Sequence, residues 1–388
     1  MGFTLSYIIT LFITVFVALL LTPCVRLLAF KIGAVDKPNK RRINKKTMPT
    51  AGGLAIFGAF TFSTLVLLGT KLNEFNYVQF VLPIVIAGAI IVITGLIDDI
   101  REIRPWQKSV GIVLASLIVY FFAEIRFDSF RLPWMEYVMN LPMWLNLPMT
   151  LLWIFALTNA VNLIDGLDGL ASGVSIISLS TIGIVGYFFL PGQGLFIPLT
   201  IFVMVAAIIG FLPYNYSPAT IYLGDTGALL LGFMISVLSL QGLKNATFVA
   251  VLTPMFILGV PITDTLFAMI RRKLNKQPIS SPDRMHLHHR LLALGFSQRA
   301  AVWTIYGISA VFSFIALLMN YAGQTAVILL VIATLLGMEI FIELVGILGE
   351  NRTPLLNIME FVGHKEYRQK VLEKRKRKKE LKRTINKE

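Results

Sequence analysis

Cysteine and charge are both scarce in this chain, and each scarcity excludes a class of protein. The 388 residues include one cysteine, Cys24, so no disulfide can form within the chain and most cysteine metal sites are excluded. Charged residues make up only 14% and hydrophobic residues 56% of the chain. A soluble domain carries about a quarter charged residues, so water is not the main solvent of this protein.

The chain contains a series of long apolar stretches with few or no charged residues. A helix of about 20 apolar residues crosses the hydrocarbon core of a bilayer. We predict an all-α, polytopic membrane protein with about eleven transmembrane helices. The expected spans are residues 6–30, 52–70, 78–97, 109–123, 147–163, 170–190, 195–213, 227–243, 246–270, 300–320 and 325–349. The N-terminus lacks the basic segment of a cleavable signal peptide, so the first span should be retained.

Lysine and arginine are distributed unevenly between the two predicted sides. Of the 35, 30 follow odd-numbered spans and four follow even-numbered ones; the bias is still 17 to four without the last segment. The positive-inside rule therefore predicts an outer N-terminus and a cytoplasmic C-terminus. The basic run at 374–379 suits the anionic inner leaflet better than a nucleic acid, and we predict no nucleic-acid partner.

Acidic and amide side chains gather on the predicted cytoplasmic side. Asp98 and Asp99 end the third span, and adjacent carboxylates repel unless a cation or proton lies between them. The pair therefore suits metal binding or general-base chemistry, with a solvated helix end as the structural alternative. Asn159, Asn162 and Asp165 recur every three residues and would share one face of a helix.

Two glycine-flanked acids continue this pattern. Gly166 and Gly169 bracket Asp168 and allow the backbone to approach a ligand closely. The spacing and the missing terminal glutamate exclude a calcium loop. Asp225, between Gly224 and Gly227, is the only charge in its loop, and the pattern predicts either a magnesium ligand or a helix N-cap.

Histidines cluster in one further segment on the same side. Three of the four in the chain are His286, His288 and His289. Zinc would require a bend to bring such close neighbours together, and the flanking Arg284 and Arg290 favour an anion. We predict diphosphate contact or proton transfer for this segment.

Two more polar features lie on or near the predicted cytoplasmic side. The basic loop at 36–46, which contains Lys46, leads into the glycine-flanked helix start at 49–53 and suits phosphate. Asp264 lies within a predicted span, where an ionised group is usually paired, and Arg271 or Arg272 is the expected partner.

Four of these motifs resemble, in order and spacing, those of the polyprenyl-phosphate N-acetylhexosamine-1-phosphate transferases. They are Leu96–Asp99, Asn159–Gly169, Leu223–Gly227 and His286–His289. The resemblance covers nearly the whole chain up to about residue 349. It implies an inner-face cleft, Mg²⁺ with Mn²⁺ as an alternative, a UDP-sugar donor and a polyprenyl phosphate acceptor. The products would be a polyprenyl diphospho-sugar and UMP.

The resemblance also assigns roles to residues. Asp98, Asp99, His288 and His289 are the predicted catalytic residues, and Asp225 is the predicted metal ligand. The predicted substrate-binding residues are Asn159, Asn162, Asp165, Gly166, Leu167, Asp168, Lys46, Arg284 and His286. Direct attack by the lipid phosphate with Asp98 as base, and a covalent aspartyl intermediate, both remain open.

The spaced histidines are similar to the branch that uses UDP-N-acetylglucosamine and undecaprenyl phosphate to begin teichoic-acid-type polymers. The muramoyl-pentapeptide branch has contiguous histidines followed by Phe-Glu, where this chain has Arg290 and Leu291, so that branch is the alternative. One departure is Asn44, where the family often has histidine. A transporter is the alternative of another class, although these acids lie at helix ends rather than at mid-membrane.

These features predict residues 1–349 as a transmembrane catalytic domain and 350–388 as a basic cytoplasmic tail. The expected location is the bacterial plasma membrane, with the site at the cytoplasmic face and membrane lipid around the spans. The sequence leaves a homodimer open.

Overall fold

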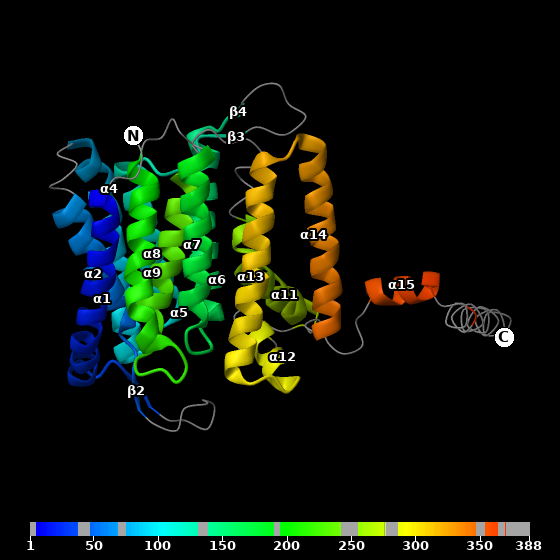
Figure 1. Ribbon diagram of the computed structural model, residues 1–388, viewed down its shortest axis with the longest axis horizontal. Coiled ribbons are helices and arrows are strands. Elements are labelled where there is room, and N and C mark those ends of the chain that lie inside the picture. Colours follow the sequence, from blue (N-terminus) through cyan, green and yellow to red (C-terminus); the bar gives the residue numbers. More distant parts are fainter. Residues whose placement is uncertain are drawn as a thin grey trace.

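Helices make up almost all of the structure, a computed structural model that describes residues 5–37, 47–68, 75–130, 139–189, 195–241, 255–274, 276, 286–346, 354–363 and 369 (Figure 1). The long helices are α1 (Leu5–Ile32), α4 (Phe75–Arg101), α5 (Pro105–Phe122), α6 (Met143–Ile164), α7 (Leu170–Phe189), α8 (Phe196–Asn215), α9 (Gly224–Gln241), α11 (Gly259–Leu274), α13 (Gln298–Tyr321) and α14 (Gln324–Val345). The all-α prediction is confirmed.

Shorter elements connect and extend these helices. They are α2 (Gly52–Thr61), which continues as a π-helical stretch (Phe62–Leu68), α12 (Leu287–Ala293) and α15 (Pro354–Gly363). Strand β1 (Val35–Asp36) pairs antiparallel with β2 (Met48–Pro49), and β3 (Ser129–Phe130) pairs in the same way with β4 (Met139–Asn140). The β1–β2 pair and α12 lie at one end of the bundle, and β3–β4 lies at the other (Figure 1).

Within the described residues, nine helices are long and apolar enough to cross a membrane. The polytopic membrane prediction is therefore confirmed, although the number falls below the eleven expected. The span expected at 52–70 is the shorter apolar segment Gly52–Leu68. The span expected at 246–270 lies partly outside the described residues. Helix α11 overlaps its second half and continues to Leu274, and the three basic residues in its last turn lower its hydropathy.

Helix α9 forms the centre of the bundle, with α4 and α6 packed against it over most of its length. Every residue from 226 to 241 is buried. Gly232 explains part of this closeness, because a Cβ there would lie 2.7 Å from the Cα of Thr158 in α6. Small residues let helix backbones approach in a membrane, where apolar surface alone gives little drive to associate.

Two more glycines fix the N-terminal end of α9. A Cβ on Gly53 of α2 would lie 2.4 Å from the backbone nitrogen of Gly227, and one on Gly95 of α4 would lie 2.5 Å from the Cα of Thr226. No other residue could occupy either position without moving a backbone. These contacts bring Asp225, in the first turn of α9, to the end of α4.

Helices α13 and α14 stand to one side of this core (Figure 1). Helix α13 packs on α7 and α11, whereas α14 is the least buried of the nine spans. Near the end of α14, the buried Glu343 accepts hydrogen bonds from the backbone nitrogens of Leu355 and Leu356, each at 2.7 Å. These bonds satisfy two N–H groups in the first turn of α15 and attach it to α14.

Candidate active site

A cavity of about 590 Å³ opens near the β1–β2 pair, where α4 and α6 end and α9 begins. Its volume is in the usual range for small-molecule sites. Its polar lining is carried mainly by acids and amides from these three helices and the α6–α7 turn, with a histidine from α12. The lining includes Asp36, Thr50, Asp98, Asp99, Glu102, Asn162, Asp165, Gly166, Leu167, Asp168, Asn215, Tyr222, Gly224, Asp225, His289 and Gln298.

Asp99 caps the central helix. Its Oδ1 accepts from the backbone nitrogen of Asp225 at 3.0 Å, and its Oδ2 accepts from the backbone nitrogen of Thr226 at 3.0 Å and from the Thr226 hydroxyl. The first N–H groups of a helix have no partner within it, and a carboxylate at that end is favoured by the helix dipole. Asp99 therefore holds the start of α9 in place as well as lining the cavity.

Asp98 and Asp225 share one cation, Lys108. The Nζ of Lys108, in the first turn of α5, lies 2.6 Å from Asp98 Oδ2 and also contacts Asp225 Oδ2. Asp98 Oδ1 in turn accepts from the backbone nitrogen of Ile103 at 2.8 Å. Lys108 thus reduces the repulsion between two carboxylates that share its single positive charge.

The two amides of α6 are placed differently. Asn162 donates from Nδ2 to Asp225 Oδ1 at 2.7 Å, so it orients the carboxylate that Lys108 also contacts. Asn159 donates to the carbonyl of Phe155, four residues earlier in its own helix, at 2.7 Å. Among the residues described here, Asn162 lines the cavity and Asn159 does not.

Asp165 follows α6 directly and faces the other acids. Burial, and then the nearby charges of Asp225, Asp99 and Asp168, raise the pKa of its carboxyl to about 8. A proton or a bound cation is therefore needed to keep this group in its place near neutral pH.

The turn after Asp165 connects the acids to two other segments. Asp168 Oδ2 accepts from the backbone nitrogen of Ala219 at 3.1 Å, which fastens the segment before α9. A Cβ on Gly166 would lie 2.3 Å from His288 Nε2, so only glycine leaves room for that ring. Leu167 is 5% exposed, belongs to the apolar core and lines the cavity.

The rings of the three histidines lie next to one another in a series that leads to the cavity. The rings of His286 and His288 are nearly parallel with centroids 6.0 Å apart, and the His288 and His289 centroids are 4.1 Å apart. Only His289 of the three lines the cavity. Burial, and then the adjacent His289, lower the pKa of His288 to about 3, so its imidazole is neutral near neutral pH.

Asp264 and Arg290, close to the histidine segment, have partners that the sequence did not predict. Asp264 Oδ2 lies 2.9 Å from His286 Nδ1, and its Oδ1 accepts from the backbone nitrogen of Leu287 at 2.9 Å. Arg290 donates from Nε to the carbonyl of Val345 at 3.1 Å, at the end of α14. Arg290 is thus bound to α14 and is not among the cavity-lining residues described.

Lys108 is the main site residue that sequence reasoning missed. In the sequence it was counted only as one of the positive charges on the predicted cytoplasmic side. In the structure it contacts both Asp98 and Asp225. Its signal was a lone lysine in the first turn of an apolar helix, nine residues after Asp99. The predicted substrate-binding residues Lys46 and Arg284 lie outside the described residues.

The described part of the chain holds no cluster of three or more His, Cys, Asp or Glu side chains arranged for a metal. Magnesium does not require one, because it binds through one or two carboxylates together with substrate phosphates and water. The oxygens of Asp225, Asp98 and Asn162 fit that ligand set, whereas the nitrogen-rich set preferred by zinc is absent from the described cavity lining.

Comparisons with known proteins point to one family of transferases, and the similarity covers most of the chain. A family profile described as Glycosyl transferase family 4 matches residues 81–243, which contain Asp98, Asp99, Asp165, Asp168 and Asp225. The chain is 40% identical over 349 residues to the probable undecaprenyl-phosphate N-acetylglucosaminyl 1-phosphate transferase of Bacillus subtilis, covering 89% of this chain and 94% of that protein.

Two further relatives have related names. Identity is 34% over 334 residues with the decaprenyl-phosphate N-acetylglucosaminephosphotransferase of Mycolicibacterium smegmatis, covering 79% of this chain and 81% of the relative. It is 27% over 306 residues with the undecaprenyl-phosphate alpha-N-acetylglucosaminyl 1-phosphate transferase of Escherichia coli K12, covering 76% and 79%.

Proposed function

Because the chain belongs to glycosyl transferase family 4, we propose that it transfers N-acetylglucosamine 1-phosphate from UDP-N-acetylglucosamine to undecaprenyl phosphate and releases UMP. The observation that carries the proposal is a cavity lined by Asp98, Asp165, Asp225 and His289. Lys108 contacts two of these acids, Asp98 and Asp225. Such a cavity, at the end of a membrane bundle, suits a diphosphate donor from water and an acceptor whose hydrocarbon stays in the bilayer.

The reaction forms a bond between an acceptor phosphate oxygen and the β-phosphorus of the donor, and breaks the bond from that phosphorus to the oxygen of UMP. Charge is spread over phosphate oxygens in the transition state, so positioned cations and donors are the main requirement. Lys108 supplies a positive charge, and the His289 ring, on the cavity wall, supplies a hydrogen-bond donor toward the diphosphate.

The two adjacent acids have separate tasks in this proposal. Asp99 keeps the start of α9 in register through its three hydrogen bonds, and using it as a nucleophile would break them. Asp98 lies on the Lys108 side and is the better placed of the two to face the acceptor phosphate.

Asp225 would hold Mg²⁺, with Asn162 orienting its carboxylate and Asp98 close by. When bound, the ion would neutralise charge on the donor diphosphate. Mn²⁺ takes the same oxygen ligands and would serve as a substitute.

The finer assignments follow from the same activity. The positive-inside bias of the sequence supports a cytoplasmic cavity in a bacterial plasma membrane, with the basic tail near anionic lipid. The product would begin a cell-surface polymer of the teichoic-acid type.

Arg290 and Leu291 bear on the alternative donor, UDP-muramoyl-pentapeptide. Arg290 is bound to the Val345 carbonyl and Leu291 is buried, so neither side chain is placed to read a donor in the cavity. The preference for UDP-N-acetylglucosamine therefore rests on the relatives rather than on these two positions.

The donor is tested with purified full-length protein, undecaprenyl phosphate and Mg²⁺. We expect UMP release from UDP-N-acetylglucosamine. We expect little release from UDP-muramoyl-pentapeptide, because its lactyl-peptide arm finds no dedicated contacts among the described residues of the cavity. A preference for the pentapeptide donor would reject this branch of the activity, and inactivity toward every UDP-sugar would reject the activity itself.

The raised pKa of Asp165 predicts that cation binding depends on pH. Its pKa of about 8 means that the carboxyl is mostly protonated at pH 7, and a cation bound among the neighbouring acids would expel that proton. We expect the apparent affinity for Mg²⁺ to rise with pH until about pH 8 and then level off. Calorimetric titrations at pH 7 in two buffers of different ionisation enthalpy should detect the released proton, and Asp165→Asn should abolish the difference. Equal affinity across this range would contradict the expectation.

A further inference from the structure

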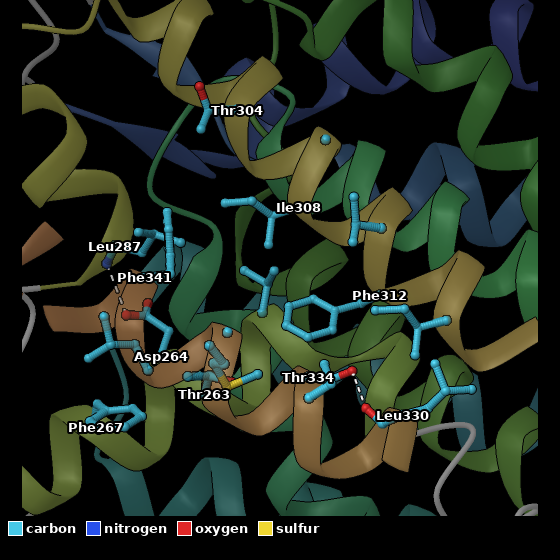
Figure 2. A pocket seen from close by; sticks show the side chains of 18 residues that line it. Thr263, Asp264, Phe267, Leu287, Thr304, Ile308, Phe312, Leu330, Thr334 and Phe341 are labelled. Carbon is cyan, nitrogen blue, oxygen red and sulfur yellow. Dashed lines mark hydrogen bonds between the residues drawn. The ribbon is translucent and has the colours of Figure 1, made fainter. Parts of the chain in front are cut away.

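Asp264 is an acid buried on the wall of an apolar cavity, away from the candidate active site. The cavity, about 600 Å³, lies between α11, α13 and α14, and Figure 2 shows Asp264 among its aliphatic and aromatic side chains. Asp264 is 4% exposed. Burying an ionised carboxyl is costly unless hydrogen bonds compensate, so the position of this group calls for a specific partner.

Both carboxylate oxygens of Asp264 are bound to the start of the histidine segment. Oδ2 faces Nδ1 of His286 at 2.9 Å, and Oδ1 accepts from the backbone nitrogen of Leu287 at 2.9 Å, the bond drawn in Figure 2. A carboxylate can only accept, so Nδ1 is the protonated nitrogen of the His286 ring. Asp264 therefore fixes the orientation of that ring.

The same contacts anchor α12, which is only seven residues long. His286 is its N-cap residue, and its side chain makes no cap hydrogen bond. A helix this short is not stable alone, and its first N–H groups need partners from elsewhere. Asp264, from α11, provides one.

The ring that Asp264 holds is the first of a continuous series. His286 stacks on His288, His288 lies against Gly166 and contacts His289, and His289 lines the acidic cavity. Displacing His286 would disturb the later rings, because the His288 ring lies parallel to it and the His289 ring lies 4.1 Å from His288, centroid to centroid.

We propose that Asp264 is a positioning residue for the transfer reaction, which holds the histidine segment so that His289 faces the donor diphosphate. The inference rests on the proposed function. Asp264 itself does not line the acidic cavity, so it acts through His286 and α12 rather than on a substrate. Outer partners of this kind typically change activity by about 10- to 100-fold when they are removed.

The test uses full-length protein with ¹⁵N-labelled histidine, since the chain contains only four histidines. Asp264→Asn keeps an acceptor for the Leu287 nitrogen but removes the carboxylate from His286. We expect the population of the Nδ1-protonated form of His286 to fall, the His288 signal to shift, and kcat with UDP-N-acetylglucosamine to drop about 10- to 100-fold. The KM for undecaprenyl phosphate should change less than twofold.

Thr334→Val is the matched control. Thr334 lines the same apolar cavity, and its hydroxyl donates to the Leu330 carbonyl within α14 (Figure 2). It should alter neither the histidine signals nor kcat. A similar loss in this variant would show that any disturbance of the apolar cavity suffices and would overturn the specific role of Asp264.

A second route guards against misfolding of Asp264→Asn. His286→Gln removes the other partner of the contact and should lower kcat to a similar extent, and the double variant should be no slower than either single one. Additive losses would overturn the proposal, as would full activity with an altered His286 signal. If the wild-type protein were inactive on UDP-sugars, the proposed function would fail, whereas the histidine spectra would still test the contact between Asp264 and His286.

Discussion

Replacing Asp225 with asparagine is expected to lower turnover by at least about 10²-fold, the usual consequence of removing one group that stabilises transition-state charge. The fold should survive, because the start of α9 is capped by the Asp99 carboxylate and not by the Asp225 side chain. An asparagine would still accept from Asn162, but it would lose the charge that contacts Lys108 and that Mg²⁺ requires. UMP release measured over a range of Mg²⁺ concentrations is the readout.

Asp128→Asn provides the control for this substitution. Asp128 is paired with Arg126 at 2.7 Å, close to the β3–β4 pair at the opposite end of the bundle. It should leave turnover unchanged. Near-normal activity of Asp225→Asn at ordinary Mg²⁺ would remove Asp225 from the reaction.

Replacing Lys108 with methionine is expected to have an effect of similar size on turnover and the opposite effect on cation affinity. The ammonium lies between Asp98 and Asp225, so its loss removes about 10²-fold of charge stabilisation in the transition state. It also removes a competitor for the same carboxylates, so half-maximal activity should require less Mg²⁺. Methionine keeps much of the apolar stem and therefore its packing in α5.

Lys31→Met tests whether any inner-side lysine would give the same result. Lys31 is an exposed residue in the last turn of α1. We expect no change in turnover or Mg²⁺ dependence there. If Lys108→Met also kept full turnover, the bridge between the two acids would be structural only.

Much of the fold could be predicted from the sequence because a bilayer imposes length and hydropathy directly. Turn signals alone divided the uncharged stretch after Gly169, and the structure places the end of α7 at Phe189, α8 at Phe196–Asn215 and the start of α9 at Gly224. The π-helical stretch after Thr61 was not predictable, because its residues are as apolar as those of an ordinary span.

Several of the acids that line the cavity could be singled out from the sequence, but the pairs that they form could not. Asp98 and Asp99 look equivalent in the sequence, yet one helical step turns them about 100° apart, so one faces Lys108 and the other caps α9. The bonds of Asp264 to His286 and of Arg290 to Val345 join segments 22 and 55 residues apart. Such partners depend on how helices are rotated against one another, which spacing along the chain does not specify.

The fate of the donor β-phosphate distinguishes transfer of a sugar together with its phosphate from transfer of the sugar alone. Full-length protein would be incubated with Mg²⁺, undecaprenyl phosphate and UDP-N-acetylglucosamine carrying radioactive phosphorus in the β position. We expect the label to enter the lipid product and the nucleotide to be released as unlabelled UMP. Label retained on released UDP, with only the sugar moved to lipid, would contradict the proposed reaction.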